Sequence, residues 1–175
     1  MRSFLNLSQH TAHCINILNE QLGRLISWLS LLMVLVVFAI VVLRYLFDIS
    51  WVMMQESVVY LHSLLFMLGA AYTLKHDGHV RVDIIYQRCN DRSKAWIDLL
   101  GTVFLLIPVA TFITWASWEY VADSWDILES SRNSGGLPLV YLLKSCLILM
   151  PVLLILQGVA LVLTKMNDLL GAKHG

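Results

Sequence analysis

The stretch that decides the fold is Leu-Leu-Met-Val-Leu-Val-Val-Phe-Ala-Ile-Val-Val-Leu, residues 31–43, in which every side chain is apolar. A transmembrane β-strand alternates apolar and polar positions, whereas this run is apolar on all sides, as expected of a helix in lipid. It lies within a longer run without Lys, Arg, Asp or Glu, residues 25–43. A helix needs about 20 apolar residues to cross a hydrocarbon core roughly 30 Å thick, so this run and its flanks are long enough.

Three further runs without charge follow, at residues 57–74, 99–118 and 145–164. The chain of 175 residues is 58% hydrophobic and only 14% charged, which is too apolar for an ordinary soluble domain. Its three cysteines are far apart, and no disulfide is expected. We therefore predict an all-α integral membrane protein with four transmembrane helices, at about 25–47, 51–74, 95–118 and 138–164.

The basic residues indicate how the helices cross the membrane. Nine of the twelve lie in the two termini and in the connection between the second and third spans: Arg2, Arg24, Lys75, Arg81, Arg88, Arg92, Lys94, Lys165 and Lys173. Because cytoplasmic segments are enriched in Lys and Arg, we expect both termini and this connection in the cytoplasm. The predicted organisation is a cytoplasmic segment, a single membrane domain and a cytoplasmic tail, at residues 1–24, 25–164 and 165–175.

The N-terminal segment has helical periodicity. Ile15, Leu18 and Leu22 recur at helical spacing, opposite Asn16 and Asn19. This pattern predicts either an amphipathic helix that lies on the membrane or on a partner, or a helical extension of the first span.

One histidine lies deep within a predicted span. Polar side chains are costly in lipid, so His62, about a third of the way along the second span, is a candidate for function or subunit contact. It could change its protonation, bind haem or form a hydrogen bond with another helix. The other three spans contain no histidine to act as a second haem ligand, which favours the interhelical hydrogen bond.

Two other features of the first two spans point to helix contacts. Arg44 ends the first span and Glu56 begins the second, so we expect Arg44 to pair with Glu56 or Asp48 across the short connection. Gly69 and Thr73 lie four residues apart and give the second span a face that another helix can approach closely. That face favours assembly, within the chain or with a partner.

The string His76-Asp77-Gly78-His79-Val80-Arg81-Val82-Asp83 directly follows the second span. Its histidines and aspartates suggest a metal site, but no further Cys or His is near and the spacing matches no structural zinc site. Alternating Arg81 and Asp83 favour a salt-bridged cytoplasmic elbow instead. The chain has no nucleophile–base pair, phosphate-binding loop or dinucleotide fingerprint, so we expect no enzymatic activity, cofactor or metal. Its zero net charge gives no reason to expect nucleic acid as a partner.

Several of these motifs together resemble the small membrane subunit of the tripartite ATP-independent periplasmic (TRAP) transporters. The resemblance runs from about Leu25 to Leu163. It is carried by Arg44-Tyr45, the segment from Trp51 to Glu56, the string from Leu68 to Asp83, Ser134-Gly135-Gly136-Leu137-Pro138, and Lys144.

The resemblance implies a subunit of the bacterial inner membrane with no transport site of its own. It would bind a large multi-spanning subunit that moves substrate and sodium by an elevator-like motion, after a periplasmic binding protein delivers the substrate. The small subunit would extend the fixed scaffold, membrane lipid could fill part of the interface, and the substrates would be organic anions with a carboxylate. The candidate interface or structural residues are Arg44, Glu56, Gly69, His79, Arg81, Asp83, Gly135, Gly136 and Lys144.

Two other functions stay open at this stage. A four-helix membrane anchor of a redox complex would hold haem or quinone, and the haem would give a Soret band. A small proton-coupled exporter would use Glu56 as its proton carrier, and it would transport without any other chain.

Overall fold

The computed structural model describes residues 2–79, 86 and 89–171. Its elements are α1 (Arg2–Leu46), α2 (Val52–Lys75), α4 (Asp91–Gly101), the π-helical turn η1 (Thr102–Leu106), α5 (Ile107–Asp126) and α6 (Val140–Gly171). Four helical stretches are long and apolar enough to cross a membrane: Ser8–Leu46, Val52–Lys75, Arg92–Asp126 and Val140–Asn167. The prediction of an all-α protein with four membrane-spanning helices is therefore confirmed.

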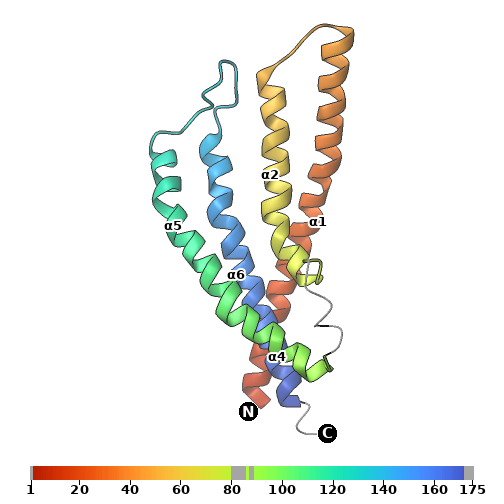
Figure 1. Ribbon diagram of the computed structural model, residues 1–175, viewed down its shortest axis with the longest axis vertical. Coiled ribbons are helices and arrows are strands. Elements are labelled where there is room, and N and C mark those ends of the chain that lie inside the picture. Colours follow the sequence, from red (N-terminus) through yellow and green to blue (C-terminus); the bar gives the residue numbers. More distant parts are fainter. Residues whose placement is uncertain (1, 80–85, 87–88, 172–175) are drawn as a thin grey trace.

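The helices form two neighbouring pairs, α1 with α2 and α5 with α6 (Figure 1). Helix α6 also contacts α1 and α2, so it joins the two pairs. Both termini lie at one end of the bundle, which we call the terminal end. The connections at residues 47–51 and 127–139 lie at the opposite, distal end.

The N-terminal segment and the first span form one continuous helix, so the second of the two alternatives for this segment, a helical extension, is the one observed. Its apolar face points outward, with Leu18 50% and Leu25 69% exposed. The buried positions recur at helical spacing and include two polar side chains: Ser8, Ala12, Asn19, Gly23 and Ile26. The polar face of this segment is therefore directed at the rest of the chain.

A glycine allows α1 and α2 to approach closely. A Cβ atom at Gly23 would overlap the side chain of Tyr72, and even the Cβ of Tyr72 would lie only 2.7 Å away. Any larger residue at position 23 must push the two helices apart.

The third span combines α4, η1 and α5. Asn90 caps its start, because the side-chain oxygen accepts a hydrogen bond from the Ser93 backbone N–H at 2.9 Å. The π-helical turn ends two residues before Pro108, which lacks a backbone donor and so disturbs the regular hydrogen-bond ladder. The helix continues to Asp126, beyond the predicted end near 118, because Glu119, Asp123 and Asp126 lie on its exposed side.

Candidate functional site

Glu56, near the start of α2, binds the distal connection between α5 and α6. Its Oε1 accepts hydrogen bonds from the Ser131 hydroxyl at 2.5 Å and from the Asn133 side-chain amide at 2.8 Å. Its Oε2 accepts from the Leu137 backbone N–H at 2.7 Å. We call the set of Glu56, Ser131, Asn133 and Leu137 the distal latch. It joins the α1–α2 pair to the α5–α6 pair through one carboxylate.

The backbone of the distal connection is folded to meet this carboxylate. A tight turn is closed by the hydrogen bond from Gly136 N–H to Asn133 C=O at 3.0 Å, and Gly135 has φ +74°. That positive φ at the third position of a turn favours glycine. A Cβ at Gly136 would lie 2.7 Å from Glu56 Oε1 and would overlap Ser131, so Gly136 leaves room for the carboxylate. The structure thus brings together three predicted residues, Glu56, Gly135 and Gly136.

A second carboxylate holds the start of the same connection. Glu129 accepts a hydrogen bond from the Lys144 ammonium on α6 and another from the Ser124 hydroxyl at 2.7 Å. The Lys144 ammonium also lies 3.9 Å from the centre of the Tyr120 ring. The hydrogen bonds from Lys144 and then Ser124 hold the pKa of the Glu129 carboxyl below its ordinary value of 4.5. Lys144, a predicted residue, is therefore anchored within the chain.

The depressed pKa of Glu129 predicts a pH dependence of stability. A carboxylate with a lower pKa in the folded state stabilises the fold above its unfolded pKa of about 4.5, and this contribution is lost as pH falls through the folded pKa. We expect Glu129→Gln to lower the unfolding temperature of the detergent-solubilised protein at neutral pH. The difference from wild type should shrink below about pH 4. Thermal unfolding of both proteins across pH checks this, and a difference that grows in acid contradicts it.

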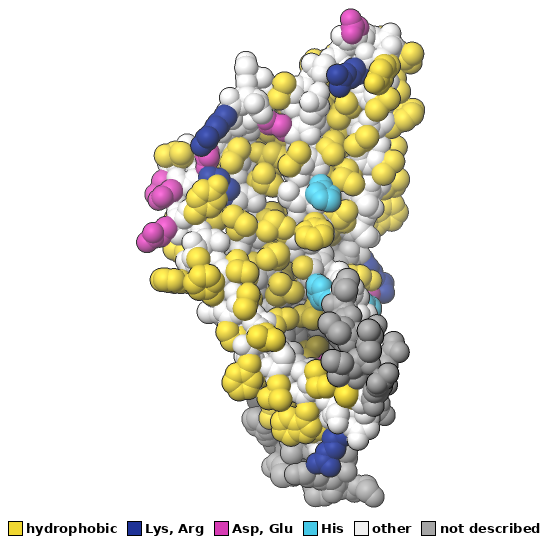
Figure 2. All heavy atoms as spheres, viewed as in Figure 1, with side chains coloured by type: hydrophobic (Ala, Val, Ile, Leu, Met, Phe, Trp, Pro, Cys, Tyr) yellow, Lys and Arg dark blue, Asp and Glu magenta, His cyan; other side chains and the backbone are white. Residues whose placement is uncertain are grey.

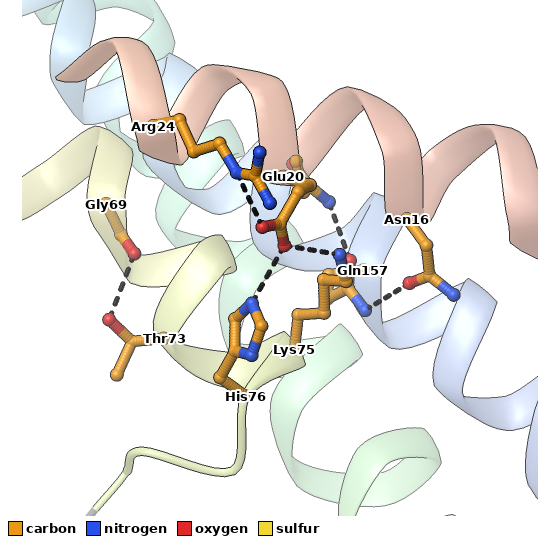
Figure 3. A network of polar contacts seen from close by, with 9 residues as sticks. Asn16, Glu20, Arg24, Gly69, Thr73, Lys75, His76 and Gln157 are labelled. Carbon is orange, nitrogen blue, oxygen red and sulfur yellow. Dashed lines mark hydrogen bonds and ion pairs between the residues drawn. The ribbon is translucent and has the colours of Figure 1, made fainter. Parts of the chain in front are cut away.

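At the terminal end, Glu20 of α1 is bound by the end of α2 (Figure 3). Its Oε2 lies 2.6 Å from Lys75 Nζ and 2.8 Å from His76 Nε2, while its Oε1 lies 3.0 Å from Arg24 Nε. The Tyr72 ring packs on His76, with ring centroids 4.4 Å apart. One carboxylate therefore links α1 to α2 at this end also.

Side-chain amides link the same part of α1 to α6 (Figure 3). Asn19 Nδ2 donates to Gln157 Oε1 at 2.7 Å, and Gln157 Nε2 donates to Asn16 Oδ1 at 2.9 Å. Asn19 and Gln157 are 1% and 3% exposed, so these amides depend on each other for hydrogen bonds. We call Asn16, Asn19, Glu20, Lys75, His76 and Gln157 the terminal network.

The other predicted residues lie apart from these two clusters. Arg44 is exposed at the end of α1, and it forms no ion pair with Asp48 or Glu56, so the predicted pairing is wrong. The physical reason is that both Glu56 oxygens already accept hydrogen bonds from the distal connection. Gly69 lies on α2 away from the other helices, and His79 is exposed beyond α2. Arg81 and Asp83 lie outside the described residues.

Sequence reasoning missed the terminal network. Gln157 is the one amide in the uncharged run 145–164, and such a side chain in an apolar helix usually finds a polar partner. Asn16 and Asn19 were noticed only as the polar face of a surface helix. Their spacing of three residues was the signal that one side of α1 contacts a polar group on another helix. In the part of the chain that the structure describes, no group of three or more His, Cys, Asp or Glu could hold a metal ion.

Four long apolar helices, held together by polar contacts at both ends, define a multi-pass helical membrane protein. The family model of the tripartite ATP-independent periplasmic transporters, DctQ component, matches residues 33–167. The chain belongs to this family, whose members are the small membrane subunits of TRAP transporters, and the predicted resemblance is confirmed. No curated protein and no solved structure matches the chain.

Proposed function

We propose that this small subunit is a non-catalytic scaffold, which binds the large multi-spanning subunit of its transporter and extends the fixed part of it. The transporter would use a sodium gradient and a periplasmic binding protein to take up organic anions that carry a carboxylate. Substrate and sodium would bind in the large subunit, and this chain would contact neither during transport.

The observation that carries the proposal is that the carboxylates at the ends of the bundle form hydrogen bonds within the chain. The carboxylates of Glu20, Glu56 and Glu129 each accept hydrogen bonds that tie helices or connections to one another at the ends of the bundle. Such contacts hold helices in fixed relative positions, whereas a carrier needs a substrate site near the membrane midplane that becomes accessible from each side in turn.

The outer surface supports assembly. Figure 2 shows apolar side chains along the whole length of the visible face. Large apolar side chains on several helices are mostly exposed, including Phe38 at 67%, Phe104 at 69% and Phe112 at 61%. Lipid and a partner subunit are the surroundings that suit this surface.

The distribution of basic residues supports an orientation. Nine of twelve Lys and Arg lie within residues 1–24, 75–94 and 165–175, which favours a cytoplasmic terminal end and a periplasmic distal end. In a bacterial inner membrane, the distal latch would then face the periplasm.

Reconstitution tests the proposal. We expect proteoliposomes with this chain, its large subunit and the binding protein to take up substrate when a sodium gradient is imposed. Omitting the small chain should abolish uptake or reduce it strongly, and the small chain alone should transport nothing. Proton-dependent flux by the small chain alone, lost in Glu56→Gln, would instead establish the exporter. A Soret band that copurifies with the chain would indicate a redox anchor.

A further inference from the structure

Helix α2 presents one narrow exposed stripe. After Met53, the only side chains of α2 that are exposed are Gln55, Val59, His62 and Phe66. Their spacing of four, three and four residues continues on the same side with Gly69 and Thr73. Residues that alternate at spacings of three and four lie along one side of a helix, the side along which a second helix can pack. The rest of α2 is partly or fully covered by its own chain.

Space beside Gly69 is open among the described residues. A Cβ added at Gly69 would meet no described atom of another helix or loop within 4 Å, and the Gly69 carbonyl accepts a hydrogen bond from Thr73 Oγ1 at 3.1 Å. At Gly23, by contrast, a Cβ would overlap Tyr72. The packing of α1 on α2 therefore uses Gly23, whereas Gly69 and Thr73, labelled in Figure 3, lie on α2 where no described atom comes within 4 Å of a Cβ at position 69.

His62 indicates the chemistry of that helix. It is the eleventh of the 24 residues of α2, so it lies roughly 15 Å from one end and 20 Å from the other. Its ring stacks on Phe66, with centroids 6.2 Å apart, and no described residue forms a hydrogen bond with its ring nitrogens. Lipid tails cannot form that bond at membrane depth, whereas a polar side chain of another helix can.

The shape of the stripe argues against a second copy of this chain. In a two-fold pair of parallel α2 helices, each stripe residue would meet its own copy. Phe66, 73% exposed, would face Phe66, while one helical turn further on Gly69 would face Gly69. A helix of different sequence can place a small residue opposite Phe66 and a large one opposite Gly69, which fits both sites.

We propose that the α2 stripe, Gln55, Val59, His62, Phe66, Gly69 and Thr73, is where a transmembrane helix of the large subunit packs. That helix carries a hydrogen-bonding side chain level with His62 and a bulky apolar side chain over Gly69. The inference rests on the proposed function, because it assumes that the large subunit is the partner.

A pair of glycine substitutions tests the surface. Gly69→Leu should leave the isolated chain as stable as wild type because no described residue occupies the space beside Gly69. It should reduce the large subunit recovered with the tagged chain from coexpressing membranes by about tenfold, since it blocks the close approach. Gly101→Leu is the matched control, because a Cβ there also meets nothing within 4 Å, and it should recover as much large subunit as wild type.

Photo-crosslinking then identifies the neighbour directly. In the coexpressed complex, benzoylphenylalanine at position 66 should form an adduct with the large subunit, and the same group at the exposed position 112 of α5 should not. An adduct between two copies of this chain, or no protein adduct from position 66 in an intact complex, overturns the inference. If wild-type chain recovers no large subunit, the proposed function fails as well.

Discussion

Replacing Glu56 by alanine is expected to free the distal connection from α2 and to lower the unfolding temperature of the purified protein by several degrees. The carboxylate accepts three hydrogen bonds, from Ser131, Asn133 and Leu137. Removing it leaves three donors without their acceptor and breaks the link between the two helix pairs at this end. Protease cleavage within residues 127–139 should become faster in the variant, because the loop is no longer held against α2.

Glu56→Gln is the matched control for the distal latch. Glutamine keeps the length of the side chain and one acceptor oxygen. Its amide nitrogen cannot accept a hydrogen bond, so the bonds made to the other carboxylate oxygen are lost. Its unfolding temperature and cleavage rate should lie between those of wild type and Glu56→Ala. Equal stability and equal cleavage in all three proteins would show that the latch does not hold the connection.

Replacing Gln157 by leucine is expected to destabilise the folded chain by roughly 2 kcal/mol. The substitution removes the acceptor for Asn19 Nδ2 and the donor to Asn16 Oδ1. Asn19 is 1% exposed, and its Oδ1 already lacks a hydrogen-bond partner, so water cannot easily take over the lost bond. Equilibrium unfolding of the solubilised protein with a denaturing detergent measures the difference in free energy of unfolding.

The double variant Asn19→Leu/Gln157→Leu separates hydrogen bonding from packing. If the loss arises from an unpaired buried amide, then removing both partners should restore part of the stability lost in Gln157→Leu. Additive losses from the two single substitutions would contradict an energetic link between α1 and α6 through this pair. Thr164→Val serves as a control, because the Thr164 hydroxyl donates its hydrogen bond to the Ala160 carbonyl within α6 rather than to another described helix.

The number and type of the helices could be predicted because they depend on local composition. Residues 31–43 are apolar on every side, and four uncharged runs of about the right length admit few other structures in a bilayer. The start of the third span also depends on a local signal, because Asn90 lies directly before the helix and caps it with its own side chain. The family could be predicted from short sequence motifs, such as the string from Leu68 to Asp83. The family model that matches residues 33–167 confirms this prediction.

The polar contacts were predicted less well because each joins residues far apart in the chain. Glu56 was singled out, but the partner expected was Arg44, twelve residues away, rather than Ser131 and Asn133. Charge and proximity in sequence suggested that pair, whereas the actual acceptor geometry depends on how the α5–α6 connection folds over α2. The partner of Asn19 lies 138 residues away on α6, and no local pattern specifies which helices become neighbours.

The sequence by itself determined the membrane class, the four helices and the family, because hydropathy and motif composition are local properties. It singled out Glu56 and Lys144 among the polar residues, but not the members of the terminal network. The tertiary structure alone decided which of those residues meet. It showed Glu56 bound to the 131–137 segment and Glu20 bound to the end of α2. It also showed that Gly69 faces outward, although the small residues around it were equally compatible with a contact inside the chain. The physical reason is that hydrogen bonds and close helix approaches require particular relative positions of helices, which are set by packing across the whole chain.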